Sequence, residues 1–339
     1  MRALHTLLLS IIVLISACTS TAIRQNNSPD WVDGRSKHYS TQLYLTGQGM
    51  ADNLIDAKDR ARADLAKQFE VAINENSLQQ QKYTQQQQDE QSTERLQQSI
   101  TRQLITQTTR TVQGIEIADS WHDKNTGMNH ALAVLSRNKA KQNFEQKINQ
   151  LDQQSSQKTK QAEAEKNKLK KAAVVQQAIN AQLERQAVQS ALQVVDNSGR
   201  GKPETISLAE LVRARDKLIS EIKISPKTVG PQQQQLQPIL SGSTASAGFQ
   251  ISTAEQADYT LLAEIKLNPA LEKNRWIWLL GTLKLRLIDQ NNNDIGIQRW
   301  PIKAASATIE QTEQRLLNEI NTILKKELRT TLLGFSSVD

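Results

Sequence analysis

The stretch from Arg137 to about Val195 contains neither glycine nor proline and is rich in Gln, Lys, Glu, Ala and Leu. Because most of these residues have high helix propensity, the sequence predicts a continuous helix over the whole stretch. At about 1.5 Å per residue, an unbroken helix of this size would reach roughly 85 Å. We therefore expect folded parts on either side of a long polar helix.

Apolar stripes occur only near the two ends of this predicted helix. Phe144, Ile148 and Leu151 form one stripe, and a second runs from Val175 to Leu192, while the tract 152–168 between them is polar. A sustained coiled coil needs consecutive heptads with apolar a and d positions. The pattern favours a solvated connecting helix, with a coiled-coil dimer as the alternative.

Residues 29–151 have the pattern of a small sheet covered by a helix. The run 43–49 predicts a short strand, and its end, Gly47-Gln48-Gly49, is interpreted as a strand-to-helix turn. Asn53 or Asp52 can cap the following helix, in which apolar residues recur every three or four positions.

A glutamine-rich stretch, residues 79–91, is expected to be an exposed arm that leads into a second helix around residues 96–104. Two β-prone runs follow, residues 112–121 and 128–135. The turn-forming residues 122–127 separate these runs, so the sequence predicts a hairpin.

In the region 205–339, a helix is expected over Ser207–Glu221, then a proline- and glutamine-bearing linker over Pro226–Pro238 and a short helix over Ala245–Ser252. Three β-prone runs then predict an antiparallel meander. A closing helix with one apolar face follows, from Ile309 to Leu332. The predicted strands are 259–267, 276–288 and 295–303.

The predicted fold class is α+β, with two small sheet-plus-helix domains joined by a long polar helix. The first domain is placed at 29–151 and the second at 205–339, with the polar helix and linker at 152–204.

Cys18 is the only cysteine, and it ends a short apolar segment. Residues 1–17 carry Arg2 and no acidic residue, and they end in the small pair Ser16-Ala17. The apolar core is too short for a membrane-spanning helix, which needs about 20 residues. The pattern resembles the lipobox of bacterial lipoproteins, which implies that the Cys18 thiol receives a diacylglycerol and that Cys18 becomes the acylated N-terminus.

Residues 1–17 are thus predicted to be a lipoprotein signal peptide, and residues 18–28 a lipid-proximal tether. Thr19 stands where, by the same resemblance, an aspartate would indicate retention in the inner membrane. We expect a lipid anchor of two or more acyl chains on the periplasmic side of the outer membrane. The alternatives are an ordinary secretory signal with an incidental cysteine, or an apolar anchor that is never cut.

The chain is basic, with a formal net charge of +7, which becomes +6 when Arg2 leaves with the signal peptide. The predicted export excludes nucleic acid as the expected partner, so anionic lipid headgroups or cell-wall polymer are favoured as counter-charges. The simpler alternative is that these charges solvate long helices. With Cys18 acylated, no thiol remains for a disulfide, and stability must come from packing.

The sequence offers few groups for catalysis. After His5 leaves with the signal, His38, His122 and His130 remain, and none has metal-ligand spacing. We find no glycine-rich phosphate loop, Gly-x-Ser-x-Gly elbow or Ser-x-x-Lys motif with matching partners. We therefore predict a protein that is not an enzyme and holds no cofactor and no metal.

The first domain contains four short motifs: Trp31, the run Tyr44–Gly49, the helix Ala61–Gln68 and the hairpin Trp121–Ala133. Together they resemble the motifs of the LPP-twenty type of lipoprotein. The resemblance covers roughly residues 29–150 and implies a cell-envelope role without a defined catalytic activity. A related module occurs in the flagellar assembly protein of the T type, a periplasmic component of the basal-body rings.

The second domain resembles the small α/β domain of envelope lipoproteins such as the penicillin-binding-protein activator and the curli secretion lipoprotein. This resemblance rests on Ala257-Asp258-Tyr259 at the start of a strand and on the long closing helix. It is a likeness in the pattern of elements, so no binding residue is carried over.

Trp276 and Trp278 share one face of a predicted strand, and Trp300 lies on the neighbouring strand. Packing within the sheet is the favoured interpretation. If the three rings were exposed together, they would form a stacking platform for glycan or a hot spot for a protein partner. Lys273 and Arg275 flank them and would suit an anionic ligand.

The sequence thus predicts a non-catalytic outer-membrane lipoprotein, attached to the membrane through Cys18, that binds another envelope protein or peptidoglycan. A role in assembly of the flagellar basal body is the first alternative, and regulation of peptidoglycan synthesis or hydrolysis is the second. A homo-oligomer also remains open.

Overall fold

The computed structural model describes residues 28–34, 36–84 and 114–336 and has a mixed α+β fold, which confirms the predicted class. A short 3₁₀ helix, η1, spans Asp30–Asp33. The α-helices are α2 (Leu54–Thr84), α4 (Arg137–Ala164), α5 (Lys168–Val195), α6 (Leu208–Ser220), α7 (Gln233–Ser246) and α8 (Ile309–Phe335). The strands are β1 (Tyr44–Ala51), β2 (Glu116–His122), β3 (Asn129–Ser136), β4 (Lys223–Val229), β5 (Gln250–Ile251), β6 (Tyr259–Leu267), β7 (Leu271–Lys273), β8 (Trp276–Asp289) and β9 (Asp294–Ser306).

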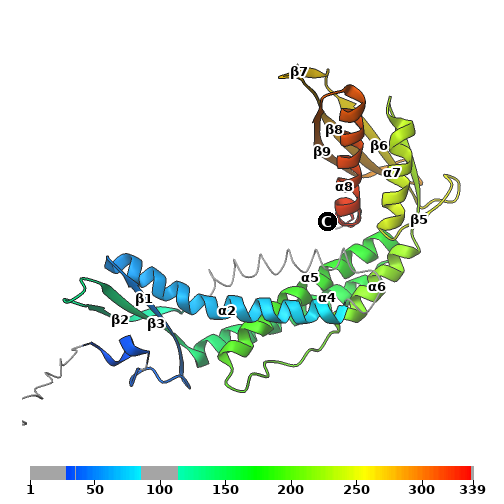
Figure 1. Cartoon of the computed structure of the whole chain (residues 1–339). Coiled ribbons are helices and arrows are strands. Elements are labelled where there is room, and N and C mark those ends of the chain that lie inside the picture. The colour runs from blue at the N-terminus through cyan, green and yellow to red at the C-terminus, as the bar shows by residue number, and fades with distance from the viewer. Residues whose placement is uncertain (1–27, 35, 85–113, 337–339) are drawn as a thin grey trace, which may run out of the picture.

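The molecule is elongated and bent, with a sheet at each end (Figure 1). The N-terminal sheet has three antiparallel strands in the order β1-β3-β2, and the predicted hairpin is present as β2 and β3. Helices α4 and α5 lie between the two sheets, and the C-terminal sheet with α7 and α8 forms the other end (Figure 1).

Two glycines of β1 allow α2 to lie directly on the N-terminal sheet. A Cβ at Gly47 would lie 2.5 Å from the carbonyl oxygen of Ala61, and one at Gly49 would collide with the backbone of Ala57. The predicted strand-to-helix turn at these glycines is therefore wrong, because β1 continues through them to Ala51. The close approach of helix and strand excludes any side chain at these positions.

Asn53 caps α2, since its Oδ1 accepts a 2.9 Å hydrogen bond from the amide of Asp56. The helix continues to Thr84, so the glutamine-rich stretch is helical up to that residue. The rest of the predicted arm and the second helix predicted at 96–104 lie outside the described residues.

The second face of the N-terminal sheet is covered by the chain that leads into β1. Trp31 of η1 is buried against Leu132 and Val134 of β3. Its indole Nε1 donates a 2.7 Å hydrogen bond to the carboxylate of Asp119 on β2. This small sheet is therefore packed on both faces.

The continuous helix predicted from Arg137 to Val195 is wrong. It is two helices, α4 and α5, that pack side by side within one chain and break at residues 165–167 (Figure 1). Asn167 causes the break, because its Oδ1 accepts hydrogen bonds from the amides of Leu169 and Lys170 and so caps α5. Asn167 is held by Tyr259 of β6, whose hydroxyl lies 2.9 Å from its Nδ2.

The polar tract 152–168 faces α5 rather than solvent alone. Ser155 and Ala162 are buried, and Asp152 forms an ion pair with the buried Arg185 of α5 at 3.0 Å. Most of the tract is exposed or half-buried as expected, but it is not an isolated connecting helix, because one side of it pairs with α5.

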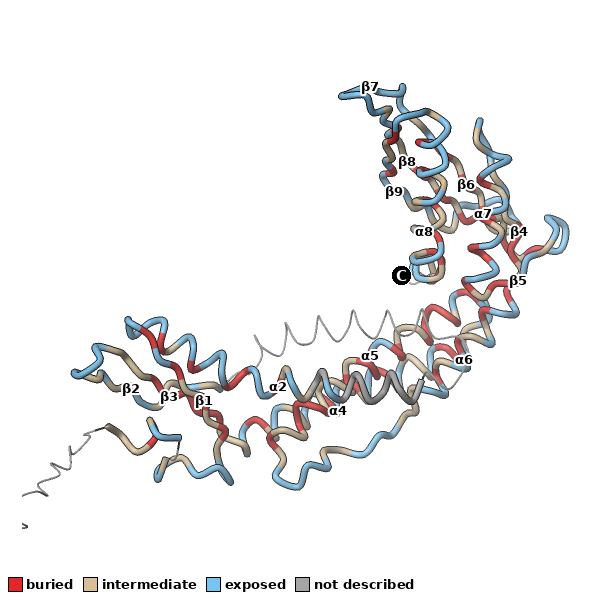
Figure 2. Tube along the Cα trace, viewed as in Figure 1, coloured by how far each residue is buried: buried red, intermediate tan, exposed pale blue. Residues whose placement is uncertain are grey.

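Helix α5 is shared by both ends of the molecule. Leu169 in its first turn belongs to the core of the C-terminal sheet, and Leu192 and Val195 in its last turn belong to the core of the N-terminal sheet. Buried positions run along the helix in Figure 2. Because this one helix is packed into both cores, it fixes how the two sheets are spaced.

The C-terminal sheet has six strands. The predicted antiparallel meander is present as β6-β8-β9, and β4 adds to it in parallel with β6. Helices α7 and α8 share one apolar core on one face of the sheet. The predicted stripe of α8 is confirmed, with buried residues Leu316, Ile320, Leu324, Leu328 and Leu332.

Two predictions for the segment before β6 are wrong. Residues 226–238 are not a linker, since Pro226 lies in β4, opposite Leu261, and Pro238 lies within α7. The helix expected at 245–252 is absent because α7 ends at Ser246 and Gly248 adopts a φ of 92°. The chain then enters β5. The predicted helix at 207–221 is present as α6, capped by Ser207.

Candidate functional site

Cys18, the predicted lipidation residue, lies outside the described residues, as do the predicted signal peptide and most of the tether. Among the helices that the structure describes, none combines the length and apolar character needed to cross a bilayer.

The structure separates the three tryptophans that the sequence grouped. Trp276 and Trp278 are exposed on β8, whereas Trp300 is buried on β9 opposite the buried Leu283. The Trp300 indole donates a 2.6 Å hydrogen bond to Glu327 of α8. Trp300 therefore belongs to the core under α8, and a platform of all three rings is wrong because their strands present them to opposite faces.

We name the face of the C-terminal sheet that lies opposite α7 and α8 the open face. On β8, Leu279, Leu283, Leu285 and Leu287 are buried toward the helices, while the alternating residues are half-buried or exposed. Trp276 and Trp278 belong to this second set. Their indole rings therefore lie on the open face.

A β-hairpin made by β7 and the start of β8 extends the apolar surface of the open face. Leu271 pairs with Trp278 and Lys273 pairs with Trp276, so each pair shares a face. Asn274 and Arg275 form the turn with φ values of 54° and 65°. Sequence reasoning missed β7 because it has only three residues.

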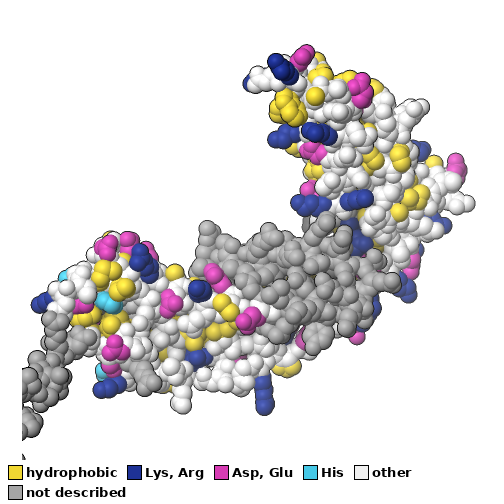
Figure 3. Space-filling view, viewed as in Figure 1, with side chains coloured by type: hydrophobic (Ala, Val, Ile, Leu, Met, Phe, Trp, Pro, Cys, Tyr) yellow, Lys and Arg dark blue, Asp and Glu magenta, His cyan; other side chains and the backbone are white. Residues whose placement is uncertain are grey.

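Four large apolar side chains define what we name the tip patch: Leu271, Trp276, Trp278 and Leu280. Leu271 is 53% exposed and Trp276 is 44% exposed, although both are large and apolar. At the β7 end of the molecule, Figure 3 shows hydrophobic side chains with both basic and acidic side chains around them. Large apolar side chains that gather at the surface are a feature of interaction surfaces in general, so this patch is the candidate site.

The rest of the open face is predominantly basic. Arg286 forms an ion pair with Asp294 at 2.9 Å, and Lys266 lies 3.8 Å from Glu264. The pairing of the strands and the alternation of their side chains place these basic residues on the open face: Lys227, Lys266, Lys284, Arg286, Arg299 and Lys303. The face therefore presents positive charge next to the tip patch.

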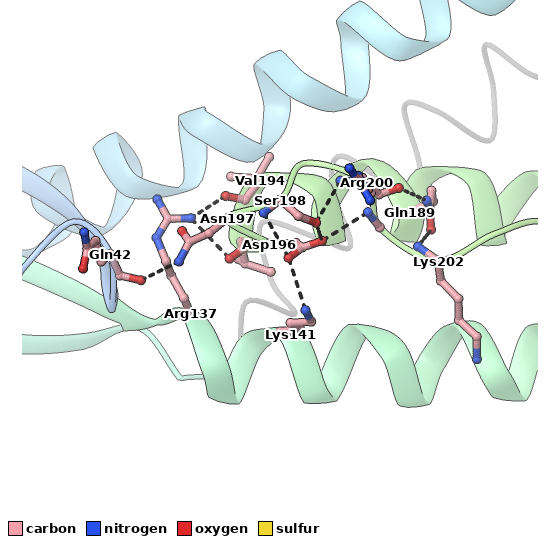
Figure 4. A network of polar contacts seen from close by, with 12 residues as sticks. Gln42, Arg137, Lys141, Gln189, Val194, Asp196, Asn197, Ser198, Arg200 and Lys202 are labelled. Carbon is pink, nitrogen blue, oxygen red and sulfur yellow. Dashed lines mark hydrogen bonds and ion pairs between the residues drawn. The ribbon is translucent and has the colours of Figure 1, made fainter.

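A separate polar network joins the end of α5 to α4 (Figure 4). The carboxylate of Asp196 accepts hydrogen bonds from the Ser198 hydroxyl at 2.5 Å and from Lys141 Nζ at 3.2 Å. These hydrogen bonds hold the pKa of Asp196 well below its usual range, and the bond from the Ser198 hydroxyl has the largest effect. Asp196 is therefore a fixed anion that secures the junction.

The same network reaches the segment before β1. Arg137 donates a 2.7 Å hydrogen bond to the carbonyl of Val194, and Asn197 donates a 2.8 Å bond to the carbonyl of Gln42 (Figure 4). Because these donors and acceptors satisfy one another, the network has the character of a structural junction.

The histidines of the described residues are not gathered into a reactive site. The ring of His130 lies against Trp121, with ring centroids 5.2 Å apart. Across the described ranges 28–34, 36–84 and 114–336, no group of three or more His, Cys, Asp or Glu is placed to hold a metal ion.

Comparisons with known proteins give likenesses of different extent. No curated protein matches the chain. A secreted protein of Helicobacter pylori is 14% identical with a TM-score of 0.43, over 83% of this chain and 96% of that one. A minor lipoprotein of Acinetobacter baumannii is 14% identical with a TM-score of 0.27, over 32% of this chain and 92% of that one.

The model of the LPP20 lipoprotein family matches residues 29–136, a segment that begins just before η1 and ends with β3. The region of this chain that forms the N-terminal sheet is therefore similar in sequence to the LPP20 lipoproteins, which confirms the resemblance stated from its motifs.

Proposed function

We propose that this protein is an outer-membrane lipoprotein, acylated at Cys18 and facing the periplasm, that acts without catalysis by binding another envelope component. The family match supports a lipoprotein of the cell envelope. The short apolar segment before Cys18 supports the anchor.

The observation that carries the binding role is the open face. The second face of the N-terminal sheet is covered by Trp31, but Trp276 and Trp278 of the C-terminal sheet are left exposed. Burying a large apolar side chain contributes about 1.5–3 kcal/mol. A surface that leaves such side chains in water is therefore suited to gain free energy from a partner.

The anchor is tested by metabolic labelling with an alkyne fatty acid, combined with separation of inner and outer membranes. We expect a labelled chain in the outer membrane, and we expect Cys18→Ala to lose the label and the membrane association. Ser20→Ala is the matched control and keeps both. A Cys18→Ala chain that stayed labelled in the outer membrane would refute the proposed anchor.

Thr19→Asp sharpens the test of location. By resemblance to lipoproteins that stay in the inner membrane, this variant should keep its label and move to the inner-membrane fraction. An acylated wild-type chain already found in the inner membrane would contradict the proposed location.

The partner is identified by in-cell crosslinking of a functional tagged chain, with mass spectrometry of the captured species. Basal-body ring proteins captured only with Cys18 intact would favour the flagellar role. Murein synthases or hydrolases would favour regulation of the wall, and self-crosslinks alone would favour a homo-oligomer. A purified chain that itself cleaved or polymerised peptidoglycan would refute a non-catalytic role.

A further inference from the structure

The tip patch lies where the molecule projects furthest beyond the core of the C-terminal sheet. The three residues of β7 are all exposed, and β7 marks one end of the molecule (Figure 1). The N-terminal sheet, which follows the tether in the sequence, lies at the other end (Figure 1). The patch is therefore a protruding edge rather than the wall of a groove.

Cations surround this apolar edge on its own face. Lys273 pairs with Trp276, Lys303 pairs with Leu280, and Arg275 lies in the turn. The nearest carboxylate in sequence, Glu272, pairs with Ile277, so it points to the opposite face. The edge thus combines indole rings and leucines with a basic rim.

The backbone of the edge is already paired. At its start, β8 pairs with β7 through Trp276 and with β9 through Ile277. Since strand pairing satisfies the peptide groups of β8, contact with an apolar layer does not leave them without hydrogen-bond partners. The outer edge of the short strand β7 can be hydrated by the polar headgroup layer.

This chemistry is that of the membrane interface. Tryptophan is enriched at the headgroup level of bilayers, where the ring is buried and its N–H stays hydrated. Lys and Arg at the surface are attracted to the negative charge of anionic lipids. A glycan site would instead combine the rings with several side chains that bind sugar hydroxyls. Here the strand partners of Trp278 are Leu271 and Ala305, and the polar groups around the patch are cations, which suit an anionic surface.

We infer that the tip patch inserts into the headgroup layer of an anionic lipid bilayer, so that the protein touches a membrane at a second point besides its lipid anchor. The inference rests on the proposed function for bringing the chain to the envelope, and it names the envelope component that the open face contacts.

The test uses the mature chain, residues 18–339, with Cys18→Ser so that no acyl chain contributes. Binding is measured by co-sedimentation with vesicles of phosphatidylethanolamine and phosphatidylglycerol, and with vesicles of phosphatidylcholine alone. We expect binding to the anionic vesicles, a blue shift of tryptophan emission, and little binding to the neutral vesicles.

Variants locate the contact. We expect the double variant Trp276→Ala and Trp278→Ala to lower the partition coefficient at least about 10-fold. Lys273→Gln and Lys303→Gln should each lower it about 5-fold at low salt. Ile55→Ala, at an exposed apolar residue of α2, and Lys124→Gln, at an exposed basic turn residue, are matched controls and should leave it unchanged.

Unchanged binding in the tryptophan variants, or equal binding to neutral vesicles, would overturn the inference. Absence of vesicle binding together with binding to purified peptidoglycan or to one envelope protein would also overturn it in favour of that partner. The proposed anchor is judged separately, since labelling at Cys18 does not depend on the tip patch. Thermal unfolding of each variant shows that lost binding does not reflect lost folding.

Discussion

The two sheets of this protein differ in what covers their second face. Each has helices on one side, α2 on the N-terminal sheet and α7 with α8 on the C-terminal sheet. The N-terminal sheet also buries Trp31 on its other side, while the C-terminal sheet leaves Trp276 and Trp278 exposed. The N-terminal sheet is thus covered on both faces by its own chain, whereas the C-terminal sheet leaves an apolar tip beside a basic face in contact with solvent.

The sheets also differ in how closely their helices approach. Gly47 and Gly49 bring α2 onto β1 at backbone distance, whereas a row of leucines separates α8 from the C-terminal sheet. The first interface tolerates no added atoms, and the second is an ordinary side-chain core.

Gly49→Val should unfold the N-terminal sheet and leave the C-terminal sheet intact. The new side chain would collide with the backbone of α2 at Ala57, and the expected cost is about 4 kcal/mol or more. Amide hydrogen exchange resolved by region measures the effect. Gly242→Ala, in α7 with open space around it, is the control and should not destabilise the chain. Equal exchange in β1 of both variants would contradict the close approach.

Trp31→Ala should expose the second face of the N-terminal sheet at a cost of about 3 kcal/mol. Trp31→Phe keeps most of the ring but loses the hydrogen bond to Asp119, so it should cost about 1 kcal/mol. Chemical denaturation, monitored by amide hydrogen exchange in β3, measures both losses of stability. If Trp31→Ala were no more costly than Trp31→Phe, the covering of this face would contribute little.

Asp196 tests the junction between the two ends. Its pKa is lowered in the folded state, so its contribution to stability is complete above the unfolded value of about 3.9 and declines as pH falls below it. Asp196→Asn should therefore flatten the loss of stability below about pH 4. At pH 7 this variant should be destabilised by about 1 kcal/mol. If the wild-type chain and the Asp196→Asn chain lost the same stability below pH 4, Asp196 would not be the source of that loss.

Trp278→Ala should cost about 1 kcal/mol or less, because the ring is 37% exposed on the open face. Thermal unfolding of this variant is compared with that of Trp300→Ala, which should cost more because it empties a buried site under α8. A large loss for Trp278→Ala would show that the open face is packed by the chain itself.

The elements that could be predicted from the sequence are those whose pattern is local. The stripe of α8 and the strands β6, β8 and β9 follow from periodicity within each segment. The break at Asn167 could not be predicted in this way, because the cap is fixed by Tyr259 from a distant strand. Likewise, Pro226 favoured a linker in the sequence, but in the structure this proline lies within β4, which pairs with β6.

Only the two tryptophans of the tip patch could be predicted from the sequence. Alternation along one strand correctly placed Trp276 and Trp278 on one face. The side of the sheet that Trp300 occupies depends on its pairing with Leu283, and the register of two strands is not encoded in either strand alone. Leu271 and Leu280 complete the tip patch, and only the hairpin geometry brings them together with the tryptophans.

If the open face contacts an envelope component in the cell, as we propose, a thiol placed on that face should be covered there. Since Cys18 is the only cysteine and is predicted to be acylated, a chain with Ala305→Cys carries one free thiol, next to Trp278 on the open face. Thr322→Cys, on the exposed side of α8, is the matched control.

The most direct measurement is the alkylation rate of each introduced thiol in the cell envelope, compared with its rate in the purified chain. We predict that the envelope protects the thiol of the Ala305→Cys chain and leaves the thiol of the Thr322→Cys chain reactive. If the thiol of the Ala305→Cys chain reacted equally fast in both settings, nothing in the envelope would cover the open face, and the proposed contact would be wrong.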